Sequence, residues 1–260
     1  MRNDGHMSSP SAVLPQARPW HHEGGSVGIL LSHGFTGSPA SMVPWGKDLA
    51  SRGYTVAVPR LPGHGTTWQD MNKTTWHDWY GTLDQELNAL RETCDQVFVV
   101  GLSMGGALAL RLAEQRPDDV TGLILVNPAV NLDRLEIKFV PFLAKVLPAI
   151  PGIGNDIAKP GVDEHGYDKT PLKALASQLE LWRDVRLNLR KVTAPILFFH
   201  STDDHVVDAS SAKIIRDGVS STYYDHIELS RSYHVATIDW DAPFIMESSA
   251  QFIHDRLANS

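Results

Sequence analysis

The 260-residue sequence predicts an α/β fold with a mostly parallel central sheet, helices on both faces of the sheet and a small inserted cap. Short apolar segments alternate with longer segments of helical character, which is the pattern of strand–helix–strand units. In addition, 42% of the residues are hydrophobic and 20% are charged. This composition suits a chain with a large buried core and excludes the disordered and coiled-coil classes.

Each predicted strand is a short apolar segment that ends at a glycine, a proline or a polar loop. In chain order, the predicted strands are 27–32, 54–58, 96–100, 122–126, 195–200 and 222–229. The predicted helices are 39–51, 76–93, 104–115, 210–217 and 244–257. Because helices connect successive strands, most neighbouring strands should be parallel.

The alternation stops between Asn127 and Arg190, where six prolines occur and no buried strand is evident. We therefore expect a cap of short helices and loops at 128–190, inserted into a core formed by 20–127 and 191–258. Residues 1–19 should form a flexible N-terminal segment. The most apolar stretch, 139–154, contains Lys145 and three prolines, so no stable membrane insertion is predicted.

The charge and the cysteine content limit which binding partners and which cellular location we expect. The formal net charge is −7 and no long basic run is present, so nucleic acid is not an expected partner. Cys94 is the only cysteine, which excludes an internal disulfide and a multi-cysteine metal site. The first 20 residues lack the basic and apolar regions of a signal peptide, and we expect a cytoplasmic protein.

The most specific motif is Gly101-Leu-Ser-Met-Gly105, which matches G-x-S-x-G and lies between a predicted strand and a predicted helix. In this motif the serine stands on a tight strand-to-helix turn, where its neighbours two positions away have no room for a side chain. The helix dipole behind Ser103 favours developing negative charge. Ser103 is therefore the predicted nucleophile, and a turn without chemistry is the alternative.

A serine nucleophile needs a base and a third group that orients the base. In the chain order that accompanies this motif, an acid follows a late strand and a histidine follows the acid. Asp203 and Asp204 both follow the strand 195–200 and are rivals for the acid. Among 12 histidines, His234 is the candidate base because it lies between the last strand and the last helix. The other candidates, His200, His226 and His254, fall in predicted strands or near the C-terminal end.

The oxyanion of a serine enzyme is commonly stabilised by two backbone N–H groups. The first should come from Met104, which follows the nucleophile. The second should come from the loop after the first strand, where His33-Gly34-Phe35 makes Phe35 the candidate donor. An ordinary turn is the alternative for this loop, and Gly63-His64-Gly65 is interpreted as a structural turn.

Five segments together resemble the α/β-hydrolase superfamily, and within it the bacterial monoacylglycerol lipases. They are His33-Gly-Phe-Thr-Gly37, Pro59-Arg-Leu-Pro-Gly-His-Gly-Thr66, Gly101 to Gly106, Asp204-His-Val-Val207 and Ser232-Tyr-His-Val-Ala-Thr237. The resemblance covers nearly all of 20–258 and implies an α/β-hydrolase fold that cleaves a fatty acyl ester of glycerol.

The family pattern, an acid two residues before an apolar pair, favours Asp204 over Asp203. By the same resemblance, the acyl group is carried on Ser103, His234 transfers the protons, and Asp204 orients His234. Neither a cofactor nor a metal is implied. Metal binding could be suggested for His21-His22-Glu23 or Asp203-Asp204-His205, but adjacent side chains in an extended segment point to opposite faces.

Substrate contacts are expected from the cap. The resemblance implies that Ile153 lies near the glycerol end of the substrate and that Glu164 accepts a hydrogen bond from a glycerol hydroxyl. Asn127 follows the end of a predicted strand, on the side of the nucleophile, and is expected to contribute to substrate binding. A set of large apolar residues either lines an acyl channel and contacts lipid aggregates transiently, or forms the core of the cap. These residues are Phe139, Val140, Phe142, Leu143, Val146, Leu147, Ile150 and Ile153.

Three other functions share this scaffold. A general carboxylesterase for short soluble esters needs the same three catalytic residues, and the sequence barely separates it from a monoacylglycerol lipase. A peroxidase or a C–C bond hydrolase would show no activity on esters. A hydrolase fold used only for binding would not react with a fluorophosphonate.

Overall fold

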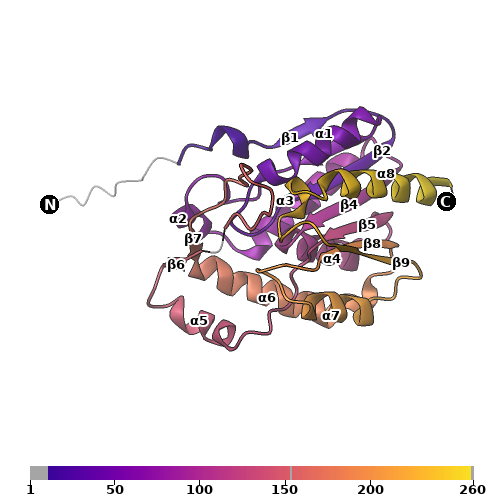
Figure 1. Cartoon of the computed structure of the whole chain (residues 1–260). Coiled ribbons are helices and arrows are strands. Elements are labelled where there is room, and N and C mark those ends of the chain that lie inside the picture. The colour runs from indigo at the N-terminus through magenta and orange to yellow at the C-terminus, as the bar shows by residue number, and fades with distance from the viewer. Residues whose placement is uncertain (1–10, 153, 259–260) are drawn as a thin grey trace.

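The computed structural model describes residues 11–152 and 154–258 and shows a central sheet between layers of helices (Figure 1). The sheet contains seven strands in the order β1-β3-β2-β4-β5-β8-β9. Their bounds are Trp20–His22 (β1), Val27–Ser32 (β2), Thr55–Val58 (β3), Gln96–Leu102 (β4), Gly122–Val126 (β5), Ile196–Ser201 (β8) and Tyr224–Leu229 (β9). All neighbours are parallel except β1 and β3, which confirms the predicted mostly parallel sheet.

The strand register determines where the site forms. Ser32 at the end of β2 lies opposite Gly101 in β4, and Leu102 lies opposite Val126 in β5. The loops that follow β2, β4 and β5 therefore meet at the carboxyl edge of the sheet, where open α/β sheets bind their ligands.

Helices cover both faces of the sheet. The α-helices are Val43–Ser51 (α1), Trp68–Met71 (α2), Trp76–Arg91 (α3), Met104–Gln115 (α4), Val140–Leu143 (α5), Leu172–Asn188 (α6), Ser210–Gly218 (α7) and Ala242–Ala258 (α8). Short 3₁₀ helices lie at Pro15–Ala17, Pro39–Ser41, Leu135–Phe139, Leu189–Lys191 and Ala236–Ile238. Helices α1 and α8 enclose one apolar core, and α3, α4, α6 and α7 enclose the other. None of these described helices is long and apolar enough to cross a membrane.

Helix α6 corrects the prediction that the cap contains only short helices and loops. It has 17 residues, and its Leu181, Trp182 and Val185 pack into the same core as α3 and α4. The sequence signal was weak because the buried face of α6 also includes Ser177 and Gln178. Strand β1 was not predicted either, since a three-residue edge strand has no apolar pattern.

The rest of the inserted segment contains α5 and a two-stranded antiparallel sheet formed by Ala149–Pro151 (β6) and Lys169–Pro171 (β7). Its apolar residues divide between a small buried core and the surface. Val140 is buried against Ala144 and Leu172 in a small core. Six others are exposed on the surface, namely Phe139, Phe142, Leu143, Val146, Leu147 and Ile150. Residues 139–172 therefore contribute both a small apolar core and an exposed apolar surface.

The N-terminal segment is partly described. Residues 1–10 of the predicted flexible segment lie outside the described residues. Beyond them, the Leu14 amide donates to Gly65 O at 2.9 Å and Ala17 is buried. A Cβ on Gly65 would lie 2.3 Å from the Cβ of Ala17, so this part of the segment packs closely on the core.

Candidate active site

Ser103 stands on the strained turn that its motif predicts. It joins β4 to α4 with φ 55° and ψ −118°, a conformation that non-glycine residues rarely adopt. A Cβ on Gly101 would lie 2.3 Å from Gly105 O, and one on Gly105 would lie 2.3 Å from Ser32 O. Glycine is thus the residue that fits at both positions, as the motif requires.

The loop after β2 lies directly against Ser103. A Cβ added to Gly34 would be 3.3 Å from Ser103 Cβ and 3.9 Å from Ser103 Oγ. Within the described chain, no acceptor is bonded to the amides of Phe35 and Met104. The amides of both predicted oxyanion donors are therefore unpaired in the described chain, Phe35 in the loop after β2 and Met104 at the first position of α4.

A buried histidine fixes the loop that contains Phe35. The Leu61 amide donates to His33 Nε2 at 3.2 Å, so Nδ1 bears the proton and donates to Gly34 O at 3.0 Å. Burial lowers the pKa of His33 to about 4. His33 is therefore neutral near pH 7, and both ring nitrogens hold backbone groups in place. His64 packs edge-on against it with ring centroids 4.9 Å apart.

The acid and the base meet at the ends of β8 and β9. His234 Nδ1 lies 2.8 Å from Asp204 Oδ2, and both side chains are almost completely buried. Asp204 Oδ1 accepts the amides of Val206 and Val207, each at 2.8 Å. Asp203 is 69% exposed and pairs with His205 instead. Of the two rival aspartates, the structure pairs Asp204 with His234.

The pair is electrostatically coupled. Burial alone would lower the pKa of His234, but the charge and hydrogen bond of Asp204, with the charges of Glu164 and Asp156, outweigh burial and raise it. Burial alone would raise the pKa of Asp204, but the charge of His234 and three hydrogen bonds outweigh that effect and lower it. Each group of the pair thus stabilises the charged form of the other.

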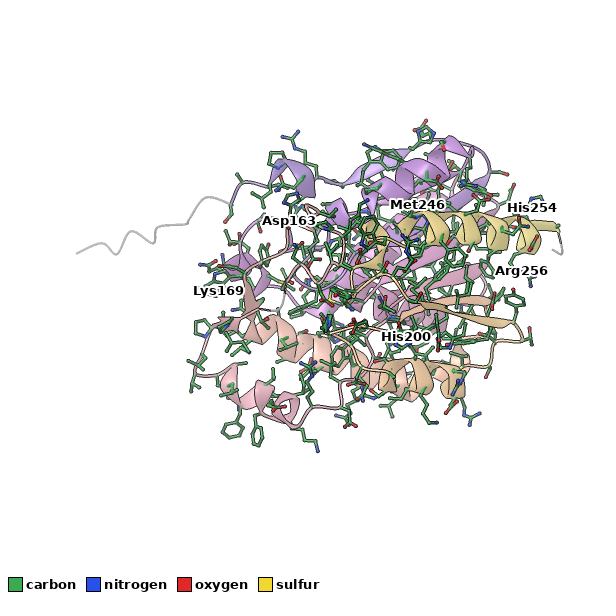
Figure 2. All side chains as sticks on the ribbon, viewed as in Figure 1. Asp163, Lys169, His200, Met246, His254 and Arg256 are labelled. Carbon is green, nitrogen blue, oxygen red and sulfur yellow. The ribbon has the colours of Figure 1, made fainter. Side chains whose placement is uncertain are left out.

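The other histidines weighed against His234 lie elsewhere. His200 lies in β8, one residue before the strand ends, and His254 is exposed near the end of α8 (Figure 2). His226 lies in β9 beside the rings of Phe198 and Tyr224. None of these three lines the cavity that contains Ser103.

Ser103 and His234 open into one cavity of about 380 Å³. No hydrogen bond joins their side chains in the described structure, as is common in serine enzymes without substrate. Much of the cavity wall is apolar. It comes from the inserted segment and from the turn after β8, residues 202–207, which contains Asp204 and is called the acid turn below. These residues include Leu132, Ile137, Ile150, Leu175, Trp182, Val206 and Val207. Apart from Ile150, the sequence analysis did not single them out for substrate contact, because they lie in loops and in the unpredicted helix α6.

The three predicted substrate residues have different outcomes. Ile153 lies outside the described residues. Glu164 lines the cavity, and its Oε1 accepts the Asn155 amide at 2.8 Å. Burial raises the pKa of Glu164. Its Oε2 has no hydrogen-bond partner in the described chain and would lie 3.5 Å from a Cβ on Gly37 in the oxyanion loop. A polar group of a ligand could therefore bind there.

Asn127 does not line the cavity. Its Nδ2 donates to Ser201 Oγ at 2.9 Å and to the backbone oxygen of His234 at 2.8 Å, while its Oδ1 accepts the Ser201 amide at 2.7 Å. The Asn127 side chain is buried. It supports the loop that contains His234, residues 230–235, which is called the base loop below, and it does not face the cavity.

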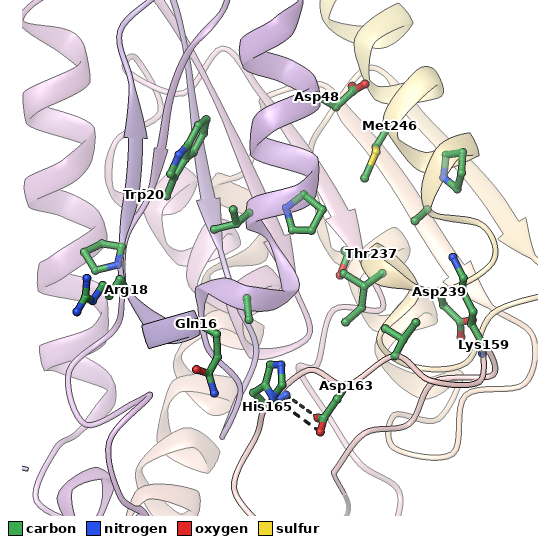
Figure 3. Close-up of a pocket in the computed structure, with 18 of the residues that line it drawn as sticks. Gln16, Arg18, Trp20, Asp48, Lys159, Asp163, His165, Thr237, Asp239 and Met246 are labelled. Carbon is green, nitrogen blue, oxygen red and sulfur yellow. Dashed lines mark hydrogen bonds and ion pairs between the residues drawn. The ribbon is translucent and has the colours of Figure 1, made fainter. Parts of the chain in front are cut away.

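A wider cavity of about 930 Å³ lies between the N-terminal segment, α1, α8 and the cap loop (Figure 3). Trp20, Asp48, Asp163 and Met246 are among its lining residues. It includes neither Ser103 nor the Asp204–His234 pair. The chemistry of the lining residues, rather than volume, therefore identifies the smaller cavity as the candidate active site.

Comparisons with known proteins identify the family of the chain. The family model described as serine aminopeptidase, S33, matches residues 27–241. A thermostable monoacylglycerol lipase from Bacillus sp. (strain H-257) is 42% identical over 95% of this chain and 98% of its own length. A carboxylesterase from Bacillus subtilis (strain 168) is 26% identical over 91% of this chain and 96% of its own length.

Solved structures give the same picture. A metagenome-derived lipolytic enzyme superposes with a TM-score of 0.91 and 39% identity, covering 94% of this chain and all of the other. A monoacylglycerol lipase from Paleococcus ferrophilus superposes with a TM-score of 0.76 over 92% of this chain and 99% of its own. Its identity is only 16%, so that match concerns the fold alone.

Proposed function

Because the chain belongs to the serine aminopeptidase S33 family and has the α/β-hydrolase fold, we propose that it is a serine ester hydrolase that cleaves monoacylglycerols to glycerol and fatty acid. The observation that supports this most is the buried Asp204–His234 pair beside the strained Ser103, in a cavity with an apolar wall. The 42% identity to a monoacylglycerol lipase favours this substrate class.

The proposed reaction begins with attack of Ser103 Oγ on the ester carbonyl carbon. Nδ1 of His234 faces Asp204 and bears a proton, so Nε2 is free to take the Ser103 proton. The bond to the glycerol oxygen then breaks, and His234 returns the proton to that oxygen. A water molecule, deprotonated by His234, attacks the carbonyl carbon of the acyl-enzyme. The bond to Ser103 Oγ then breaks, His234 returns the proton to Oγ, and the fatty acid leaves.

The amides of Phe35 and Met104 are the proposed donors to the oxyanion. Such donors act best when they are fixed before reaction, since they then need no reorganisation in the transition state. His33 holds the Phe35 loop through two hydrogen bonds, and the start of α4 holds Met104.

The two ends of the substrate match different parts of the cavity. The apolar wall formed by the cap and α6 suits an acyl chain. Glu164 Oε2 suits a glycerol hydroxyl, because a carboxylate oxygen accepts a hydrogen bond from it. Asn127 and Ile153 are not used in this proposal for the reasons given above.

The exposed apolar surface of the cap suits a transient contact with lipid aggregates. Phe142 and Val146 are 77% and 76% exposed, and Phe139, Leu143 and Leu147 extend the same surface. Apolar groups at these exposures favour insertion into a lipid surface over contact with water. The cytoplasmic location predicted from the sequence is kept as part of this proposal.

Hydrolysis of mono-, di- and triacylglycerols, with Ser103→Ala as the control, tests the proposed substrate. A monoacylglycerol lipase should cleave the monoacyl ester by far the fastest. The general short-chain carboxylesterase is the second candidate, favoured by the similarity to the Bacillus subtilis enzyme. It would prefer p-nitrophenyl acetate or butyrate over every long-chain monoacylglycerol.

A further inference from the structure

One carboxylate of the inserted segment contacts both loops that hold the acid and the base. Asp156 Oδ2 accepts the backbone amides of His205 at 3.2 Å and of His234 at 3.1 Å. Asp156 Oδ1 lies 2.8 Å from the side-chain Nδ1 of His205. We propose that Asp156 is a positioning residue for the reaction: by binding both loops, it holds Asp204 and His234 at hydrogen-bond distance from each other. This inference rests on the proposed function.

The need for such a residue follows from the topology. Asp204 follows β8 and His234 follows β9, so their 2.8 Å contact depends on the relative placement of two separate loops. Asp156 binds His234 itself and the residue next to Asp204 with the same oxygen atom. Its side chain is only 12% exposed, so water competes weakly for these charge-assisted hydrogen bonds.

Neighbouring contacts hold the same segment to the base loop. The Val235 amide donates to Asp156 O at 3.1 Å. Asp239 accepts the amides of Ala158 and Lys159 from the inserted segment and the amide of Tyr233 from the base loop. Figure 3 shows Lys159 and Asp239 next to each other. Among the described residues in these contacts, Asp156 is the one that also forms hydrogen bonds to the turn containing Asp204 and His205.

The ring of His205 completes the bridge. It packs edge-on against Tyr233, with ring centroids 4.6 Å apart, while its Nδ1 faces Asp156. From the opposite side, Asn127 donates to the backbone oxygen of His234. The base loop is thus held between the core and the inserted segment, and the acid turn is tied to the same carboxylate.

Asp156 also contributes charge. The carboxylates that face His234 are Asp204 from the acid turn and Glu164 and Asp156 from the inserted segment, and all three raise the pKa of His234. Replacing Asp156 with asparagine removes one of these charges and retains an oxygen acceptor. Replacement with alanine removes both the charge and the acceptor. The two variants therefore separate charge from position.

The test compares Asp156→Ala and Asp156→Asn with wild type on p-nitrophenyl butyrate, a soluble ester that does not depend on the lipid surface. Active sites are titrated with a fluorophosphonate, so that kcat is expressed per reactive site and is independent of the folded fraction. Asp163→Asn is the control, because Asp163 lies in the same segment, is 60% exposed and, among residues 11–152 and 154–258, pairs with His165 alone.

Asp156→Ala should lower kcat per titrated site about 10- to 100-fold with KM changed less than about threefold, since misplacement of about 1 Å can cost 10²-fold in rate. Asp156→Asn should show a smaller decrease in kcat per titrated site, and the acid limb of its pH profile of kcat/KM should lie at lower pH than in wild type. Asp163→Asn should match wild type in both measurements.

Wild-type kcat per site in Asp156→Ala, or an unmoved acid limb in Asp156→Asn, would overturn the inference. A lower thermal stability with normal kcat per site would show that Asp156 only anchors the cap, which also overturns it. If wild type itself neither hydrolyses the ester nor reacts with the fluorophosphonate, the proposed function has failed, and not merely the role of Asp156.

Discussion

Asp204 Oδ2 lies 2.8 Å from His234 Nδ1, although the two residues are 30 positions apart in the chain. Their contact forms because β8 and β9 are neighbouring parallel strands, with Ser201 opposite Leu229 at the ends that lead into the two loops. The sheet brings the loops together, and the hydrogen bond then fixes the tautomer of the base.

Asp204→Asn should lower kcat about 10⁴-fold with little change in KM, because an amide cannot stabilise the imidazolium and favours the wrong tautomer. Asp203→Asn is the matched control, since Asp203 is exposed and does not contact His234. Steady-state kinetics of both variants on one soluble ester would measure this. Equal losses in the two variants would refute the assignment of the acid.

The acid limb of the kcat/KM profile should lie above pH 6.5, because Asp204, Glu164 and Asp156 raise the pKa of His234 above that ordinary value. His234 must be neutral to accept the Ser103 proton, so activity falls as pH drops through its pKa. Glu164→Gln removes one negative charge and should move the limb to lower pH.

The same Glu164→Gln variant should lose preference for monoacylglycerols over p-nitrophenyl butyrate, since an amide oxygen is a weaker acceptor for the glycerol hydroxyl than a carboxylate oxygen. The ratio of the two kcat/KM values measures this preference. An unchanged ratio would remove Glu164 from glycerol recognition and leave the pH prediction untouched.

Gly34→Ala should lower kcat about 10-fold, because the new Cβ would press on Ser103 Cβ from 3.3 Å and shift the nucleophile relative to the oxyanion donors. Gly81→Ala in helix α3 is the matched control, as nothing lies within 4 Å of its Cβ position. That variant should keep wild-type kcat and gain about 0.5–1 kcal/mol in the free energy of unfolding. Full activity in Gly34→Ala would argue against the tight contact.

Combined replacement of Phe142 and Val146 with serine should reduce activity on emulsified long-chain monoacylglycerol by about 3- to 10-fold, because this surface loses its two most exposed apolar side chains. Activity on soluble p-nitrophenyl butyrate should stay unchanged, since neither residue lines the cavity. Vesicle sedimentation provides a direct measure of binding. A parallel loss on both substrates would point to a disturbed cap instead of a lost lipid contact.

The sequence allowed prediction of those features that depend on local pattern. The apolar strands and the glycines around Ser103 are set by sterics over a few residues, and the structure has them as expected. Helix α6 could not be foreseen in the same way, because Ser177 and Gln178 on its buried face interrupt the apolar pattern.

Contacts between distant segments that no sequence motif indicates could not be predicted. Asp156 resembles any other loop aspartate in the sequence, and only the folded chain brings it to the amides of His205 and His234. The sequence also does not distinguish buried from exposed apolar residues in 139–147, where Val140 is buried and Phe142 is exposed.

The most direct test of the account is fluorophosphonate labelling followed by hydrolysis of a monoacylglycerol. The account predicts one adduct on Ser103, release of glycerol and fatty acid by wild type, and a loss of at least about 10⁴-fold in kcat for Ser103→Ala. An unlabelled Ser103, or monoacylglycerol hydrolysis that persists in Ser103→Ala, would contradict it.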